Sequence, residues 1–199
     1  MEDYLTIDAL YKTFNEKLFK NELPECIITL QRKRNCCGYF SAERFLNLDD
    51  TKTVKDEIAL NPETFKRGQT EIMQTIVHEM CHLWQHHFGE KKSRTVYHNK
   101  EWADKMESIG LIPSNTGAQG GKRTGQKMSD YPLEGGLFLS VANKINKTIK
   151  WGSKIILKPK TENNKGTFVC PNCEQKAWAK KTASLLCGVC TNQMILIDK

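Results

Sequence analysis

Hydrophobic side chains recur at intervals of three and four residues in three stretches of the N-terminal half of the chain. This spacing predicts a first helix that ends near Asn21, a second from Thr70 to Gly89 and a third that begins at His98. The apolar faces of these helices are expected to carry Leu10, Phe14 and Leu18, then Ile72, Ile76, Val77, Met80 and Leu83, and finally Trp102, Ala103, Met106 and Ile109. Each helix should therefore bury one face.

Three short apolar runs between the first two helices predict strands at residues 27–31, 37–40 and 56–60. Asn61-Pro62 ends the third run, because proline has no N–H for a sheet ladder. Two roles are open for residues 57–61. They could form an edge strand that pairs with the backbone of a bound peptide, or they could only close the sheet.

The rest of the chain is expected to lie outside this first domain, which covers residues 1–113. Residues 114–130 are rich in glycine and predict a linker or a mobile loop. They lead into a basic C-terminal region at 131–199. Within it, residues 131–146 could form a short helix whose packing partner the pattern leaves open, and residues 151–158 predict a strand.

The second predicted helix contains the sequence His78-Glu79-Met80-Cys81-His82. Two histidines four residues apart project from the same side of a helix, so both imidazoles can bind one Zn²⁺. The glutamate beside the first histidine can accept a proton from a water molecule that the zinc activates. This arrangement is typical of zinc peptidases.

A catalytic zinc usually has three protein ligands and keeps a fourth position for water. His86 is a poor third ligand, because it lies about 12 Å from His78 along the helix axis. His87 is no better placed, and both are expected to lie at the helix end. His98 and Glu101 remain as candidates, and we favour His98. The alternative role for Glu101 is that of an exposed carboxylate that suits the helix dipole.

At this point the chain resembles the SprT-like metalloproteases, which include the Spartan-type proteases. The matching segments occur in family order across residues 5–113 and are 10–19, 22–24, 58–62, 77–82 and 98–102. The resemblance implies a small α+β, zincin-like metalloprotease domain of helices with a short mixed sheet. It implies His78, His82 and His98 as zinc ligands and Glu79 as the catalytic acid/base. It also implies action on DNA-associated proteins, as in the repair of DNA–protein crosslinks.

The C-terminal region contains two Cys-x-x-Cys pairs separated by thirteen residues, namely Cys170, Cys173, Cys187 and Cys190. Four thiolates presented by two tight turns match a closed, structural zinc site. Apolar runs on both sides predict short strands, so a small β zinc ribbon is expected over residues 166–199. Disulfides are disfavoured, because nothing in the chain indicates an oxidising compartment. The sequence therefore predicts two Zn²⁺ ions, one catalytic and one structural.

The distribution of charge along the chain indicates nucleic acid as a possible partner. Residues 1–113 carry 16 Lys and Arg against 18 Asp and Glu, whereas residues 114–199 carry 14 against 5. Lysines neutralise phosphates and an aromatic ring stacks on an unpaired base, so lysines beside tryptophans suit nucleic acid. The candidates are Lys150, Trp151 and Lys154, together with Lys176, Trp178, Lys180 and Lys181. The alternative is a solvated lysine-rich surface with the tryptophans in small cores.

Together these features predict a zinc-dependent endopeptidase whose partners are protein substrates at or near DNA and DNA itself, single-stranded DNA included. The alternative is a nucleic-acid-binding accessory protein whose histidine-bound zinc is structural or catalytically silent. The N-terminus lacks the pattern of a secretory signal, and no apolar run is long enough to span a membrane. We therefore expect an intracellular protein without a membrane partner, either cytoplasmic or nucleoid-associated, or nuclear in a eukaryote.

Overall fold

The computed structural model describes residues 2–91, 97–154 and 164–197, and the chain forms two compact units, residues 1–154 and 155–199. The helices of the first unit are α1 (Glu2–Phe19), η1 (Pro62–Arg67, a 3-10 helix), α2 (Gln69–Phe88), α3 (Lys100–Ser108) and α4 (Leu137–Ala142). Its strands are β1 (Ile27–Leu30), β2 (Gly38–Leu46), β3 (Val54–Leu60), β4 (Leu111–Ser114) and β5 (Ser129–Pro132). The second unit contains β6 (Lys165–Val169), β7 (Lys176–Lys180) and β8 (Ile195–Ile197). The predicted α+β class is confirmed. None of the described helices has the length and apolar character needed to cross a membrane.

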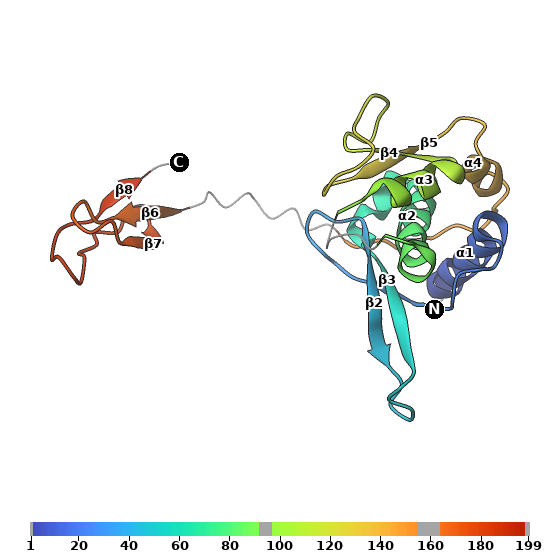
Figure 1. The fold of residues 1–199 in the computed structure, drawn as a ribbon, viewed down its shortest axis with the longest axis horizontal. Helices are drawn as coiled ribbons and strands as arrows, with labels where there is room; N and C mark the ends of the chain where they lie inside the picture. The colour runs from blue at the N-terminus through green and yellow to red at the C-terminus, as the bar shows by residue number, and fades with distance from the viewer. Residues whose placement is uncertain (1, 92–96, 155–163, 198–199) are drawn as a thin grey trace. The chain divides into compact units, whose positions relative to one another are not determined.

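β3 is the central strand of a three-stranded sheet with the order β1-β3-β2. β1 pairs with β3 in parallel and β2 pairs with it antiparallel, so the sheet is mixed as expected. Figure 1 shows β2 and β3 as a long hairpin that extends away from the helices. The register of β2 shifts between Ser41 and Phe45, where a bulge leaves residues without a partner on β3.

α2 packs against α1, α3, β2 and β3. All five members of its predicted apolar row are at most 4% exposed. The apolar rows of the predicted first and third helices contribute to the same core, as α1 and α3. Because several elements cover one face of α2, the helix cannot rotate without exposing that face, and the direction of its polar side chains is set.

The boundary between the two units differs from the expected one. It falls after Lys154 and not after Pro113. β4 and β5 pair antiparallel on either side of residues 115–128, so this glycine-rich segment is a loop of the first unit and not a linker between domains. Glycine-rich loops and linkers have the same composition, so only the pairing of the flanking strands separates them.

The short helix expected within residues 131–146 is α4, and it belongs to the core of the first unit. Phe138 has no exposed surface, and its ring centroid lies 6.0 Å from that of Phe14 in α1. Gly110 lies against the start of α4, where a Cβ atom would be 2.9 Å from the backbone nitrogen of Leu137. The φ of 84° at position 110 and the lack of room for a Cβ atom both favour glycine there.

Residues 149–151 are hydrogen-bonded to the N-terminal ends of α1 and α2, close to the point where the apolar pattern predicts the start of a strand. The side chain of Gln69 accepts a hydrogen bond from the backbone N–H of Ile149 and donates one to its carbonyl, both at 2.8 Å. The carboxylate of Asp3 accepts from the backbone N–H groups of Lys150 (3.1 Å) and Trp151 (2.9 Å). These bonds occupy donors that a strand would need, and residues 151–154 form no strand. The remainder of that predicted strand, 155–158, lies outside the described residues.

The second unit is a three-stranded antiparallel sheet with β6 in the centre, in the order β7-β6-β8. Phe168 packs with Cys170, Cys187 and Met194 in a small buried cluster. A core of this size stabilises a fold only weakly, which is the situation in which small lobes rely on a metal.

Replacing Phe138 with alanine should lower the free energy of unfolding by roughly 3–5 kcal/mol, because a fully buried ring is removed from the core between α1 and α4. Urea denaturation of the whole chain, followed by tryptophan fluorescence, measures the change. Leu137→Ala is the matched control, because Leu137 is the neighbouring residue of α4 and is 46% exposed. Equal losses in the two variants would contradict the assignment of α4 to this core.

Candidate metal centre

Three histidines from two elements converge beside α3. His78 and His82 lie one turn apart on α2, and their ring centroids are 5.3 Å apart. His98 directly precedes α3, and its ring centroid lies 5.5 Å from that of His78 and 4.7 Å from that of His82. One ring nitrogen from each histidine lies within 4.8 Å of the other two. The structure therefore brings together the three residues that the resemblance implied.

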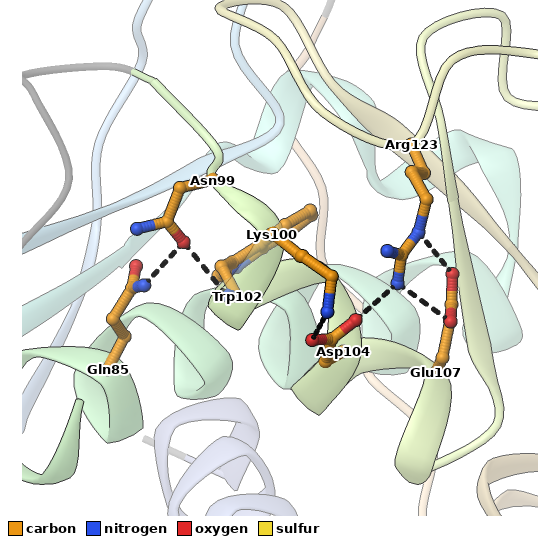
Figure 2. Close-up of polar contacts among 7 residues, drawn as sticks. All are labelled: Gln85, Asn99, Lys100, Trp102, Asp104, Glu107 and Arg123. Carbon is orange, nitrogen blue, oxygen red and sulfur yellow. Dashed lines mark hydrogen bonds and ion pairs between the residues drawn. The ribbon is translucent and has the colours of Figure 1, made fainter. Parts of the chain in front are cut away.

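The start of α3 is held against α2, and this holds His98 in place. Asn99 caps α3, since its Oδ1 accepts a hydrogen bond from the backbone N–H of Trp102 at 3.0 Å. Gln85 of α2 donates to the same oxygen through Nε2 at 2.7 Å (Figure 2). The residue next to His98 is thus fixed both to its own helix and to the helix that carries His78 and His82.

Glu101, the alternative third ligand, binds the loop after α2 instead. Its carboxylate accepts hydrogen bonds from the backbone N–H groups of Glu90 (2.7 Å) and Lys91 (3.2 Å). It also accepts one from Nε2 of Gln85 at 3.1 Å. Three donors occupy this carboxylate, and Glu101 is not part of the three-histidine group formed by the described residues.

Trp102 forms the floor of the histidine cluster. Its side chain is fully buried, and its ring centroid lies 4.4 Å from that of His98, 4.9 Å from that of His78 and 5.3 Å from that of His82. The last pair is nearly parallel, with an interplanar angle of 18°. A wide apolar ring on this side excludes water and restricts the orientations of all three imidazoles.

Two of the imidazoles have hydrogen-bond partners on the side away from the cluster. Nδ1 of His78 lies 2.8 Å from Oδ2 of Asp130, a buried residue of β5. Nδ1 of His98 lies 3.1 Å from the carbonyl oxygen of Gly125. An acceptor at Nδ1 stabilises the tautomer that carries its proton there, which leaves the Nε2 lone pair free for a metal. The arrangement matches that of histidine ligands in zinc sites.

The loop that carries Gly125 is fastened to α3 by an arginine. Nε of Arg123 donates to Oε1 of Glu107 at 2.9 Å, and Nη2 lies 2.6 Å from Oδ1 of Asp104 and 2.8 Å from Oε2 of Glu107 (Figure 2). Two residues further along, the backbone of Gly125 forms two hydrogen bonds with the backbone of His98, at 2.8 and 3.1 Å. The ion pairs and the backbone bonds together keep this loop over the third histidine.

Asp130 and Gly125 are site residues that the sequence pattern does not indicate, because the glycine content of residues 114–130 predicts a linker or mobile loop. One signal could have indicated Asp130. It is one of only two acidic residues between positions 114 and 154, the other being Glu134. A carboxylate in an otherwise basic stretch needs a partner when it is buried. For Gly125, which acts through its backbone, the sequence contains no comparable signal.

Glu79 lies beside the histidines and is 5% exposed. Burial raises its pKa to about 7, although the charge on His78 and a hydrogen bond from the backbone N–H of Phe40 lower it. Burial lowers the pKa of His98 to about 4 and holds the pKa of His82 well below its usual value. Both imidazoles are therefore neutral near pH 7, as metal ligands must be.

β2 runs along Glu79, and Gly38 allows the close approach. A Cβ atom at Gly38 would lie 2.9 Å from Cγ2 of Thr75, 3.0 Å from the carbonyl oxygen of Ala59 and 3.2 Å from Cγ of Glu79. Any larger residue would push the start of β2 away from α2. The backbone N–H of Phe40 then reaches the carboxylate of Glu79.

This geometry corrects the edge-strand hypothesis for residues 57–61. β3 is paired on both sides, by β1 and by β2, so its backbone has no free edge for a peptide. Among the described strands, β2 lies at an edge of this sheet and beside Glu79. The apolar pattern could not show this, because a central strand and an edge strand that both bury one face have similar sequences.

The four cysteines of the second unit come together in two matching turns. Their sulfur atoms lie within 4.8 Å of one another. In each turn the carbonyl of the first cysteine accepts a hydrogen bond from the residue four positions later, Glu174 (3.0 Å) or Thr191 (2.8 Å). Both of these residues have positive φ, 58° and 55°. Backbone N–H groups of Cys190 and Val189 lower the pKa of Cys187 to about 7, which favours the thiolate. Four thiols around one centre fit a closed zinc site and are compatible with a zinc ribbon.

The predicted nucleic-acid-binding residues fall into the two different units. In the first unit Trp151 is 78% exposed, and Nζ of Lys150 pairs with Glu2 at 3.1 Å. Lys154 is the last residue of that unit and is exposed.

In the second unit, Lys176, Trp178 and Lys180 alternate with the less exposed Ala177 and Ala179 along β7. Lys181 follows β7, and its backbone N–H donates to the carbonyl of Asn164 at 2.7 Å. Neither tryptophan lies in a core, so only the part of the alternative that placed them in small cores is wrong.

Comparison with known proteins gives matches for parts of the chain. The SprT-like family matches residues 7–119, a range that includes all three histidines and ends before the four cysteines. A segment of 57 residues is 51% identical to a protein of Salmonella typhimurium described as "Uncharacterized protein in mucB 3'region". This match covers 29% of the present chain and 76% of the Salmonella protein. No solved structure matches significantly.

Replacing Asp130 with asparagine should weaken zinc binding at the histidine cluster by roughly 10–100-fold, because the side chain keeps its shape but loses the charge that orients His78 and raises its basicity. Competition against a chelator of known affinity measures the change. Glu134→Gln removes the same charge from an exposed position nearby and should have no effect. An unchanged affinity in Asp130→Asn, with the fold intact, would rule out this role for Asp130.

Proposed function

The chain belongs to the SprT-like family, and from this membership and the geometry of the histidine cluster we propose that it is a zinc-dependent endopeptidase that acts on DNA-associated proteins. The observation that carries the proposal is the convergence of His78, His82 and His98 beside a buried glutamate. Three imidazoles leave one position open on a four-coordinate zinc, which distinguishes a catalytic donor set from the closed four-cysteine set of the second unit.

In the proposed peptide hydrolysis, the metal and Glu79 would perform different parts of the reaction. A zinc ion bound to the three histidines would polarise the scissile carbonyl and lower the pKa of a water molecule to near neutrality. Glu79 accepts the proton that the attacking water loses and passes it to the nitrogen of the leaving amine, so the carboxylate returns to its starting state. Burial raises the pKa of Glu79 to about 7 in the metal-free site, and a bound Zn²⁺ would lower this pKa, so the carboxylate would be ionised and able to accept the proton at neutral pH.

The edge of β2 that no other described strand occupies would offer a place for the substrate backbone. An extended peptide can add to an unpaired strand by backbone hydrogen bonds, which bind without requiring a particular sequence. β2 is an edge strand of its sheet, and Phe40 in that strand donates its N–H to Glu79. A peptide on this edge would therefore lie close to the carboxylate that moves the proton.

Glu79→Gln tests the proposal directly. Removal of the general base should abolish cleavage of a protein substrate presented on DNA, while zinc content and DNA binding remain at wild-type levels. Gel analysis of cleavage, elemental analysis and a DNA-binding titration provide the three measurements. The matched control is Glu63→Gln, an exposed acidic residue of η1. Wild-type protein that holds zinc but cleaves nothing, with or without DNA, would favour an accessory protein whose zinc is catalytically silent.

The side chains on one face of the β7-β6-β8 sheet support the proposal that the protein contacts nucleic acid. Residues directly opposite each other in an antiparallel pair point to the same side. Trp178 lies opposite Thr167, and Lys180 lies opposite Lys165. Trp178 is 74% exposed and has a lysine two residues away on either side along β7. An exposed aromatic ring between cations suits an unpaired base with its flanking phosphates, which favours single strands over duplex.

Trp178→Ala should weaken binding of a short single-stranded oligonucleotide by about 1–3 kcal/mol, because the stacking partner of one base is lost. Fluorescence anisotropy at several salt concentrations measures both the affinity and its salt dependence. The salt slope should stay the same in Trp178→Ala and should fall in Lys180→Gln, since only the lysine releases counterions. Trp151→Ala provides the comparison in the first unit. If Trp178→Ala leaves single-strand affinity unchanged, this face is not the binding surface.

A further inference from the structure

A third group of metal-ligand side chains lies at the C-terminal end of α2. Asp56 of β3 and His86 and His87 of α2 each place one ligand atom within 4.8 Å of the other two. None of these residues belongs to the three-histidine or the four-cysteine group. From the sequence alone the two histidines are expected only to lie at the helix end.

The carboxylate of this group is buried and held in one orientation. Asp56 is 5% exposed, and its Oδ1 accepts a hydrogen bond from the backbone N–H of Glu43 at 2.8 Å. Glu43 lies in the bulge of β2 with φ of 50°, a conformation that a residue with a side chain adopts at a cost. The bulge thus directs an N–H group at Asp56, and Oδ2 is left facing the end of α2.

The two histidines complete the group from the last turn of the helix. Nε2 of His87 lies 2.6 Å from Oδ2 of Asp56. The ring of His86 lies 4.8 Å from that of His87, centroid to centroid, and nearly perpendicular to it at 83°. The ring centroid of His86 also lies 5.7 Å from that of Phe40. A hydrogen bond joins Asp56 to His87, and His86, the preceding residue of α2, brings a second imidazole nitrogen within reach of the same carboxylate.

We propose that Asp56, His86 and His87 form a third metal site, which takes an exchangeable late first-row divalent cation such as Zn²⁺. Two imidazoles and one carboxylate are donors that zinc and its neighbours accept, and they are unlike the all-oxygen sets preferred by Mg²⁺ and Ca²⁺. His86 is half-buried and the side chain of His87 is 35% exposed, so water can complete the coordination and the ion can exchange. The negative end of the α2 dipole favours a cation there.

This site is separate from the histidine cluster. His86 lies about 12 Å beyond His78 along the helix axis, and the two sets of ligand atoms form separate groups, so one ion cannot serve both. A cation bound there would join the last turn of α2 to β3, and it would stabilise the native state because the unfolded chain does not present the three ligands together. Cation binding at this site is independent of proteolysis and can be measured without a substrate.

The test uses the whole chain with its tighter sites filled. After equilibration with buffered low zinc and removal of excess metal, calorimetric titration with Zn²⁺ should reveal one additional, weaker equivalent in the wild-type protein. His86→Gln and His87→Gln should each lose that equivalent while keeping the zinc bound beforehand. The same titration should raise the melting temperature of the wild type and leave both variants unchanged.

Glu90→Gln is the matched control, because it removes an exposed charge just beyond α2 without removing a ligand, and it should bind like the wild type. Circular dichroism confirms that each variant is folded. The proposal is overturned if the wild type takes up no additional equivalent. It is also overturned if that equivalent persists in both histidine variants, in which case Asp56 and His87 form an ion pair only.

Discussion

The burial of one face of α2 is the constraint on which the rest of the first unit depends. Its apolar row packs into a core shared with α1, α3 and the sheet, so the helix has one allowed rotation. That rotation directs His78 and His82 toward α3 and brings Glu79 alongside β2. The chemistry of the site therefore follows from a packing requirement, since the same two histidines on a helix free to rotate would face no third ligand.

A second set of interactions turns this packing into a defined site. Asp130 and Gly125 hold the outer nitrogens of two imidazoles, and Arg123 fastens the loop that carries Gly125 to α3. Trp102 closes the floor. Asp130 comes from β5, Gly125 and Arg123 come from the loop before it, and Trp102 comes from α3. Orientation of the ligands is thus distributed over a large part of the unit, whereas the ligands themselves are confined to α2 and the residue before α3.

The two units differ in charge and in the metal-ligand residues that they contain. The first unit contains the three-histidine group and most of the carboxylates, while the second is a small basic sheet built around four cysteines. Trp178 and its neighbouring lysines lie on the face of that sheet opposite the cysteine core. If the proposed activity holds, contact with nucleic acid and hydrolysis are performed by separate structures, and each can be altered without disturbing the other.

The sequence by itself determined the local features: the helices, the histidine pair with its glutamate, the four cysteines and the exposed lysines around Trp178. Each depends on spacing along one element, and a helix or a tight turn converts spacing into geometry directly. Only the tertiary structure brought His98 rather than Glu101 beside the other two histidines, placed Phe138 in the core and brought Asp130 to His78. It also made β2 rather than β3 an edge of the sheet formed by the described strands. These outcomes depend on which distant segments pack together. A glycine-rich stretch or a short apolar run has the same local pattern whatever it packs against, so its partner becomes visible only when the whole core is assembled.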